Sequence, residues 1–127
     1  MKPYFLLIED VLGIHGDHIE RYGGDPGVRD AGLLASAVEM ARATFDGRLL
    51  HVDLFEIAAA YLFHIVQNHP FVDGNKRTGV AAALVFLDMN GVEIEIDDDL
   101  LVEHVLGIAQ GRLGKQEIAV FLKRHAR

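Results

Sequence analysis

The 127-residue sequence contains no cysteine, which excludes disulfide bonds and thiolate metal sites and is compatible with a reducing compartment. It also lacks an excess of positive charge. Twelve Lys and Arg residues stand against 19 Asp and Glu residues, which gives a net charge of −7. Broad, nonspecific binding to nucleic acid needs a basic surface, so the charge argues against a direct nucleic-acid partner. A small local anion site is still compatible with it.

Long hydrophobic runs are missing as well. No segment reaches the roughly 18 apolar residues that a membrane span requires. The apolar run near the N-terminus stops at Glu9 and is too short for a secretory signal. We therefore expect a cytoplasmic protein without membrane contact. The length fits one domain, residues 1–127, and 50% hydrophobic with 24% charged residues fits a globular one.

Apolar residues recur at helical spacing along most of the chain. Residues 79–87 carry no charge and are apolar on every face, which predicts a central helix surrounded by others. VEIEI, residues 92–96, alternates like a short edge strand, and FDGRLLH, residues 45–51, is typical of a loop or short hairpin. The predicted fold is all-α, a compact bundle of about six helices around a central buried helix with a short β element. We expect helices at 8–22, from a cap at Asp30 to about 43, 54 to about 68, 75–90, 100–110 and 116–125.

The segment NHPFVDGNKRTG, residues 68–79, places Lys76 and Arg77 in the first turn of this apolar helix. Positive side chains at a helix N-terminus oppose the helix dipole by roughly 0.3–1 kcal/mol each. The arrangement is favourable if an anion binds there, held by free backbone N–H groups and both cations. The backbone from Gly74 to Lys76 could form such an anion nest, and we expect the ligand to be a phosphate.

Neighbouring residues suit a phosphate site. Asp73 offers a hard oxygen ligand for Mg²⁺, His69 is a candidate general base for a hydroxyl nucleophile, and Phe71 would anchor the loop in the core. Structural interpretations of the same residues stay open. The two cations could extend to water from a buried helix, Asp73 and Gly74 form a common turn pair, and a histidine before proline is often structural.

The nine residues HPFVDGNKR, 69–77, resemble the signature loop of the Fic/Doc superfamily, whose pattern is His-Pro-Phe-x-Asp/Glu-Gly-Asn-Gly/Lys-Arg. Eight defined positions match. IERYGGDPGVRDAGLL, DLFEIAAAYL and KRTGVAAALVFLDMNGVEI also look like segments of the small death-on-curing (Doc) branch, so the resemblance covers nearly the whole chain.

The resemblance implies an α-helical fold of about six helices with this loop at its centre. It implies that His69 is the base that activates a target hydroxyl, that Asp73 binds Mg²⁺ and that Phe71 is the aromatic anchor. ATP and Mg²⁺ are the implied cofactors. The residues implied to bind the nucleotide phosphates are Gly74, Asn75, Lys76 and Arg77.

Departures from the pattern bear on the reaction. AMP-transferring Fic enzymes usually have Gly at the position of Lys76 and a second Arg at that of Val80. The Doc branch has the Lys, lacks that Arg, and is known for phosphorylating a threonine of elongation factor Tu. Gly74 and Pro70, however, differ from phage-type Doc. We favour phosphoryl transfer to a Ser or Thr hydroxyl of a translation factor. AMP transfer and a non-catalytic Fic-like binding module are the alternatives.

Many Fic proteins carry an inhibitory helix of pattern Ser/Thr-x-x-x-Glu-Gly/Asn, and this sequence shows no match, since Ser36 is followed four residues later by Met40. The resemblance therefore implies a toxin neutralised in trans by a Phd-like antitoxin, with elongation factor Tu as the expected protein substrate. Residues 45–51 could serve as a flap that docks the target.

Overall fold

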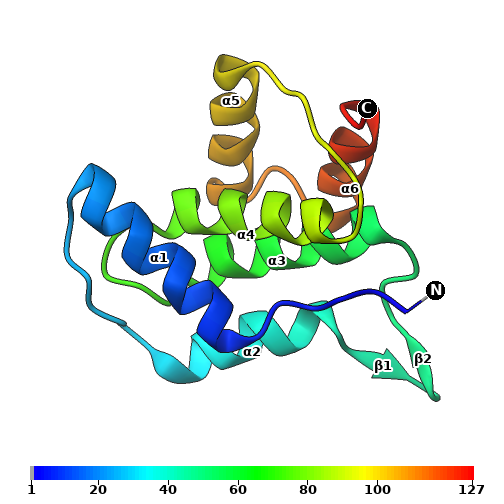
Figure 1. The fold of residues 1–127 in the computed structure, drawn as a ribbon, viewed down its shortest axis with the longest axis horizontal. Coiled ribbons are helices and arrows are strands. Elements are labelled where there is room, and N and C mark those ends of the chain that lie inside the picture. Colours follow the sequence, from blue (N-terminus) through cyan, green and yellow to red (C-terminus); the bar gives the residue numbers. More distant parts are fainter. Residues whose placement is uncertain (1) are drawn as a thin grey trace.

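The computed structural model describes residues 2–127 as six helices and one two-stranded antiparallel hairpin (Figure 1). This confirms an all-α fold of about six helices with a short β element. The elements are α1 (Ile8–Tyr22), α2 (Ala31–Ala41), β1 (Thr44–Phe45), β2 (Arg48–Leu49), α3 (Leu54–Asn68), α4 (Asn75–Met89), α5 (Asp98–Ala109) and α6 (Lys115–Arg124).

The N-termini of α2 and α3 are fixed by local side-chain caps. The Asp30 carboxylate accepts a hydrogen bond from the Leu33 N–H at 2.9 Å, and the Asp53 carboxylate accepts one from the Glu56 N–H at 2.8 Å. Aspartate at this position satisfies an N–H group that has no partner within the helix. Both helices therefore start where the sequence predicts.

Some helix ends differ from prediction by one or two residues. Helix α2 stops at Ala41 because the Ala43 carbonyl accepts the Leu50 N–H at 2.8 Å, which commits Ala43 to the hairpin. Helix α5 starts at Asp98 because Asp97 caps it, so two further acidic residues form its first turn. Helix α6 is shifted by one residue from the expected 116–125.

The central helix is α3, not α4 as the sequence predicts. Helix α3 contacts α2, α4, α5 and α6, and its residues from Ile57 to Leu62 are all buried. Three successive alanines in that run let neighbouring helices approach closely. Helix α4 instead leaves Val85 and Met89 exposed, because α5 covers only part of its outer face. The absence of charged residues from positions 79–87 therefore predicts more burial than this helix has.

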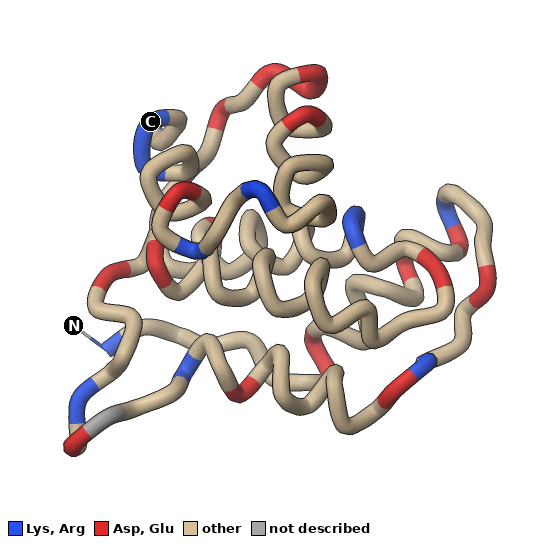
Figure 2. The backbone as a smooth tube through the Cα atoms, turned by 180° about the vertical axis from the view of Figure 1, so that it is seen from behind, with Lys and Arg blue, Asp and Glu red and all other residues tan. Residues whose placement is uncertain are grey.

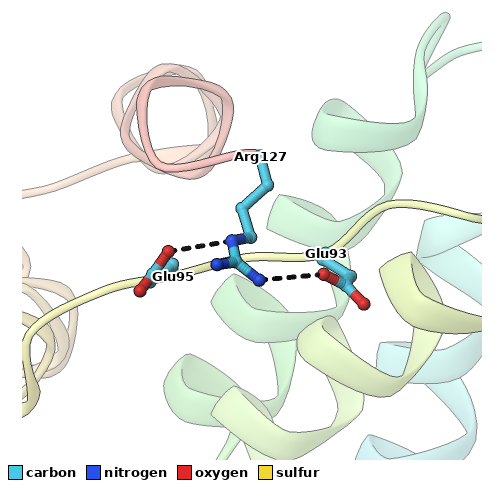
Figure 3. A network of polar contacts seen from close by, with 3 residues as sticks. All are labelled: Glu93, Glu95 and Arg127. Atoms are coloured by element: carbon cyan, nitrogen blue, oxygen red, sulfur yellow. Dashed lines mark hydrogen bonds and ion pairs between the residues drawn. The ribbon is translucent and has the colours of Figure 1, made fainter.

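The prediction of an edge strand at residues 92–96 is wrong. Within residues 2–127 only one bridge forms there, between Ile94 and Ala126, which follows α6. The guanidinium of Arg127 contacts Glu93 at 3.3 Å and Glu95 at 2.9 Å (Figure 3). These ion pairs are exposed and contribute little to stability.

The hairpin and the signature loop, residues 69–77, lie at opposite ends of α3. The hairpin precedes the first residue of this 15-residue helix and the signature loop follows its last residue. Figure 1 shows the hairpin near the N-terminus and the α3–α4 connection beside α1. A helix of that length spans about 22 Å, so a target would have to reach over this distance to contact both, and docking at residues 45–51 stays a prediction.

Charged residues gather on loops and helix ends, while α3 and α4 contain few of them (Figure 2). Lys76 and Arg77 are therefore conspicuous at the start of α4. Among residues 2–127, no helix combines the length and apolar character needed to cross a membrane.

Candidate active site

His69 takes an unusual backbone conformation at the end of α3. The helix ends at Asn68 as predicted, but His69 is left-handed, with φ 51° and ψ 53°. A residue before proline is normally extended, and a positive φ is uncommon for any residue except glycine. The left-handed turn directs the chain into the signature loop and leaves the His69 side chain exposed.

The predicted site residues line one open hollow of about 460 Å³ beside this turn. Phe71 is absent from the lining because it is fully buried beneath the loop, as expected of an anchor. The chemical roles given to these residues stay predictions, but their placement is compatible with one reaction centre. The lining residues are His69, Val72, Asp73, Gly74, Asn75, Lys76 and Arg77.

The N-terminus of α4 opens into the hollow. Gly74 is left-handed, with φ 82° and ψ 16°, and its carbonyl accepts the Thr78 N–H at 2.9 Å as the first bond of the helix. The N–H groups of residues 75–77 precede that bond and have no partner in the helical ladder. A left-handed residue followed by a helix start forms a concave set of N–H donors, which suits an anion.

Asp73 is held through both its backbone and its carboxylate. Its carbonyl accepts a hydrogen bond from His15 Nε2–H at 2.8 Å, and its Oδ2 accepts the Asp25 N–H at 2.8 Å. Gly24 lies so close that an added Cβ would be 3.2 Å from the Asp73 Cβ. The carboxylate is therefore oriented while its second oxygen can still bind a ligand.

Comparison with known proteins shows the family of the chain. Residues 5–87 match the model of the Fic/DOC family. The chain belongs to the Fic/DOC family. It is 35% identical over 116 residues to a protein named protein kinase doc from Escherichia phage P1, a match that covers 91% of this chain and 90% of the phage protein. It is 47% identical over 79 residues to a protein named toxin Doc from Mycolicibacterium smegmatis, with 62% and 61% covered.

In this Fic/DOC loop, Asn75 supports the backbone with its whole side chain. Its Oδ1 accepts the Phe71 N–H and its Nδ2 donates to the Phe71 carbonyl, both at 2.9 Å. Asn75 is buried, so any contribution to anion binding comes from its backbone N–H. The sequence pattern does not distinguish this structural use of the amide from direct phosphate contact.

His15 is a part of the site that the sequence reasoning missed. It is buried on α1, and its ring stacks on Phe71 with centroids 3.7 Å apart and an interplanar angle of 6°. Together with its bond to Asp73, this stacking connects α1 to the Fic/DOC loop. The two contacts span more than 50 positions of sequence, and no local pattern indicates them.

The residues present fit a magnesium ion that is bound together with a nucleotide. Within residues 2–127, no group of three or more histidine or acidic side chains could enclose a metal ion. Mg²⁺ often uses only one or two carboxylates and completes its shell with phosphate oxygens and water. Asp73 is suitably placed to be that carboxylate at the edge of the hollow.

Arg77 lies where the hollow meets an apolar groove. Its guanidinium is 4.4 Å from the centroid of the Tyr22 ring, a cation–π contact. The groove, of about 430 Å³, runs between α4 and α5 next to the end of α1 and is lined chiefly by aliphatic side chains. Tyr22 and Val102 on its rim are 58% and 59% exposed.

Proposed function

We propose that this Fic/DOC protein is the toxin of a toxin–antitoxin pair that phosphorylates a Ser or Thr hydroxyl of a target protein at the expense of ATP. The observation that carries the proposal is the placement of His69 on the same hollow as the free N–H groups of α4 and the two cations. The relatives named as a protein kinase and as a toxin support the reaction and the biological class. A translation factor such as elongation factor Tu is the proposed target, from the resemblance to the Doc branch.

In the proposed phosphoryl transfer, each role is assigned to a group of this chain, the target hydroxyl or ATP. His69 accepts the proton of the target hydroxyl, whose oxygen forms a bond to the γ-phosphorus while the bond from that phosphorus to the β,γ-bridging oxygen breaks and ADP leaves. Lys76, Arg77 and the N–H groups at the start of α4 bind phosphate oxygens and stabilise their charge. Mg²⁺, when bound at Asp73, would neutralise phosphate charge.

Isotopic labelling separates this reaction from AMP transfer. The protein is incubated with a bacterial translation extract and ATP labelled at either the γ- or the α-phosphate. We expect label on an extract protein from the γ-position, and no label after His69→Ala. His125→Ala is the matched control, because His125 is the C-cap residue of α6 and does not line the hollow. This variant should still transfer the label.

Other results lead to other conclusions. Label from the α-position alone would establish AMP transfer in place of phosphoryl transfer. If no label appears and His69→Ala still arrests bacterial growth, the protein acts by docking without catalysis.

The partner that neutralises the protein is proposed to be a Phd-like antitoxin that lies in the apolar groove. A segment seated between α4 and α5 would cover the Arg77 end of the hollow and block the nucleotide. Co-expression with the antitoxin from the neighbouring reading frame should restore growth, and Val102→Glu in the groove should abolish that rescue. Rescue that persists with Val102→Glu would contradict this placement.

A further inference from the structure

Arg29, in the turn between α1 and α2, donates hydrogen bonds to three consecutive carbonyl groups around His69. Its Nε donates to the His69 carbonyl at 2.6 Å and its Nη2 to the Asn68 carbonyl at 2.9 Å. Its backbone N–H donates to the Pro70 carbonyl at 2.7 Å. Arg29 therefore provides donors for the Asn68 and His69 carbonyls at the C-terminus of α3, which have no partners within the helix.

These bonds fix both peptide planes that flank the His69 Cα. The Asn68 carbonyl belongs to the plane before it and the His69 carbonyl to the plane after it, so a single rigid guanidinium constrains φ and ψ together. Among residues 2–127, only Asp46 and His69 are non-glycine residues with positive φ. Such conformations persist where the surroundings over-determine them, and they concentrate at functional sites.

The nucleotide half of the loop is held by different contacts. Asn75 is bonded to Phe71 and His15 to Asp73, and neither contact involves Arg29. The Asp30 N–H also bonds the Pro70 carbonyl at 3.0 Å, so the turn stays attached to the loop without the guanidinium. Loss of the Arg29 side chain should thus disturb His69 selectively.

We infer that Arg29 is a positioning residue, which sets the direction of the His69 side chain through the backbone while leaving nucleotide binding to residues 73–77. The inference rests on the proposed function, in which His69 is the base. It assigns a role in the reaction to an exposed arginine outside the signature loop.

The test compares Arg29→Ala and Arg29→Lys with wild type in γ-phosphate transfer to extract protein, with ATP as the varied substrate. We expect kcat to fall about 10- to 100-fold in both variants, since small displacements of a reacting group cost this much. KM for ATP should stay within about twofold of wild type. Millimolar guanidinium chloride should restore part of the Arg29→Ala rate. Arg124→Ala, which removes an exposed arginine from the last turn of α6, is the matched control and should behave as wild type.

A second readout does not depend on transfer. The Cα and Cβ chemical shifts of His69 report its φ and ψ, and we expect them to change in both Arg29 variants but not in Arg124→Ala. Wild-type kcat in Arg29→Lys, a loss confined to KM, or unchanged His69 shifts would overturn the inference. A wild-type protein that transfers no γ-label would refute the proposed function alone, because the shifts still decide the role of Arg29.

Discussion

Acidification tests the packing of α3 against α6 through one partly buried histidine. His64 of α3 lies near His51 and Lys115, and Lys115 Nζ donates to His51 Nε2 at 3.4 Å. Within residues 2–127, the buried His64 Nε2 has no hydrogen-bond partner. Burial, reinforced by the positive charges of Lys115 and His51, lowers the pKa of His64 from 6.5 to about 4.

The sign follows from proton binding in the two states. Between pH 6.5 and about 4 the unfolded chain holds a proton on His64 that the folded chain does not, so stability falls as the pH falls through this window. Without solvent screening, the lowered pKa would reduce the free energy of unfolding by roughly 2 kcal/mol between pH 7 and pH 5. The side chain is only partly buried, and we halve this to about 1 kcal/mol.

Thermal unfolding at pH 7 and pH 5 measures the effect. For a chain of this size about 1 kcal/mol lowers Tm by roughly 3–5 °C. His64→Leu should remove this part of the drop in Tm between pH 7 and pH 5. It should also stabilise the fold at pH 7, because it replaces an unsatisfied buried nitrogen with apolar atoms. His69→Gln removes an exposed histidine outside the cluster and should keep the acid loss of wild type. An unchanged acid loss in His64→Leu would refute the reasoning.

Further predictions concern packing and capping, each measured by urea unfolding. Gly79→Ala should cost about 1–3 kcal/mol, because the new methyl would lie 3.2 Å from Leu62 Cδ1 on α3. In Gly13→Ala on α1 the added Cβ has nothing within 4 Å, so this control should stabilise the fold by about 0.5–1 kcal/mol. If both variants changed the free energy of unfolding equally, the close approach of α3 and α4 would be contradicted. Phe71→Ala should cost about 3–5 kcal/mol by opening a cavity beneath the loop, and a loss below 1 kcal/mol would contradict its role as anchor. Asp30→Ala should cost about 1 kcal/mol through loss of the α2 cap, whereas no loss would mean that the cap is dispensable.

Sequence reasoning succeeded where structure is set by contacts within a few residues. The caps at Asp30 and Asp53 act over three residues and fixed the starts of two helices correctly. Gly91, which follows the helix expected at 75–90, has φ 84°, and the following N–H bonds the Leu87 carbonyl at 2.8 Å to close α4. The site residues themselves occupy nine consecutive positions, so a local motif could bring them together before any tertiary structure was known.

The failures concern properties that depend on distant partners. Whether residues 92–96 form a strand depends on a distant segment that pairs with them, and the alternation of their own side chains does not show whether one is present. The burial of α4 depended on how much of it α5 covers. His15 contacts residue 73 and Arg29 contacts residue 69, at separations of 58 and 40 positions. A histidine at position 15 or an arginine at position 29 does not by itself indicate a contact with such a distant part of the sequence.

The two halves of the signature loop are held by different side chains, although the turn after α1 contacts both of them. Helix α1 fixes the phosphate half, through His15 bonded to Asp73 and stacked on Phe71. The turn that follows α1 fixes the base half, through Arg29 and the carbonyls on either side of the His69 Cα. Because these supports share no contact with each other, changes to His15 should mainly weaken nucleotide binding, whereas changes to Arg29 should mainly slow the transfer step. A loop that contributes both the base and the anion site can thus have each function tuned separately, from residues outside its own sequence.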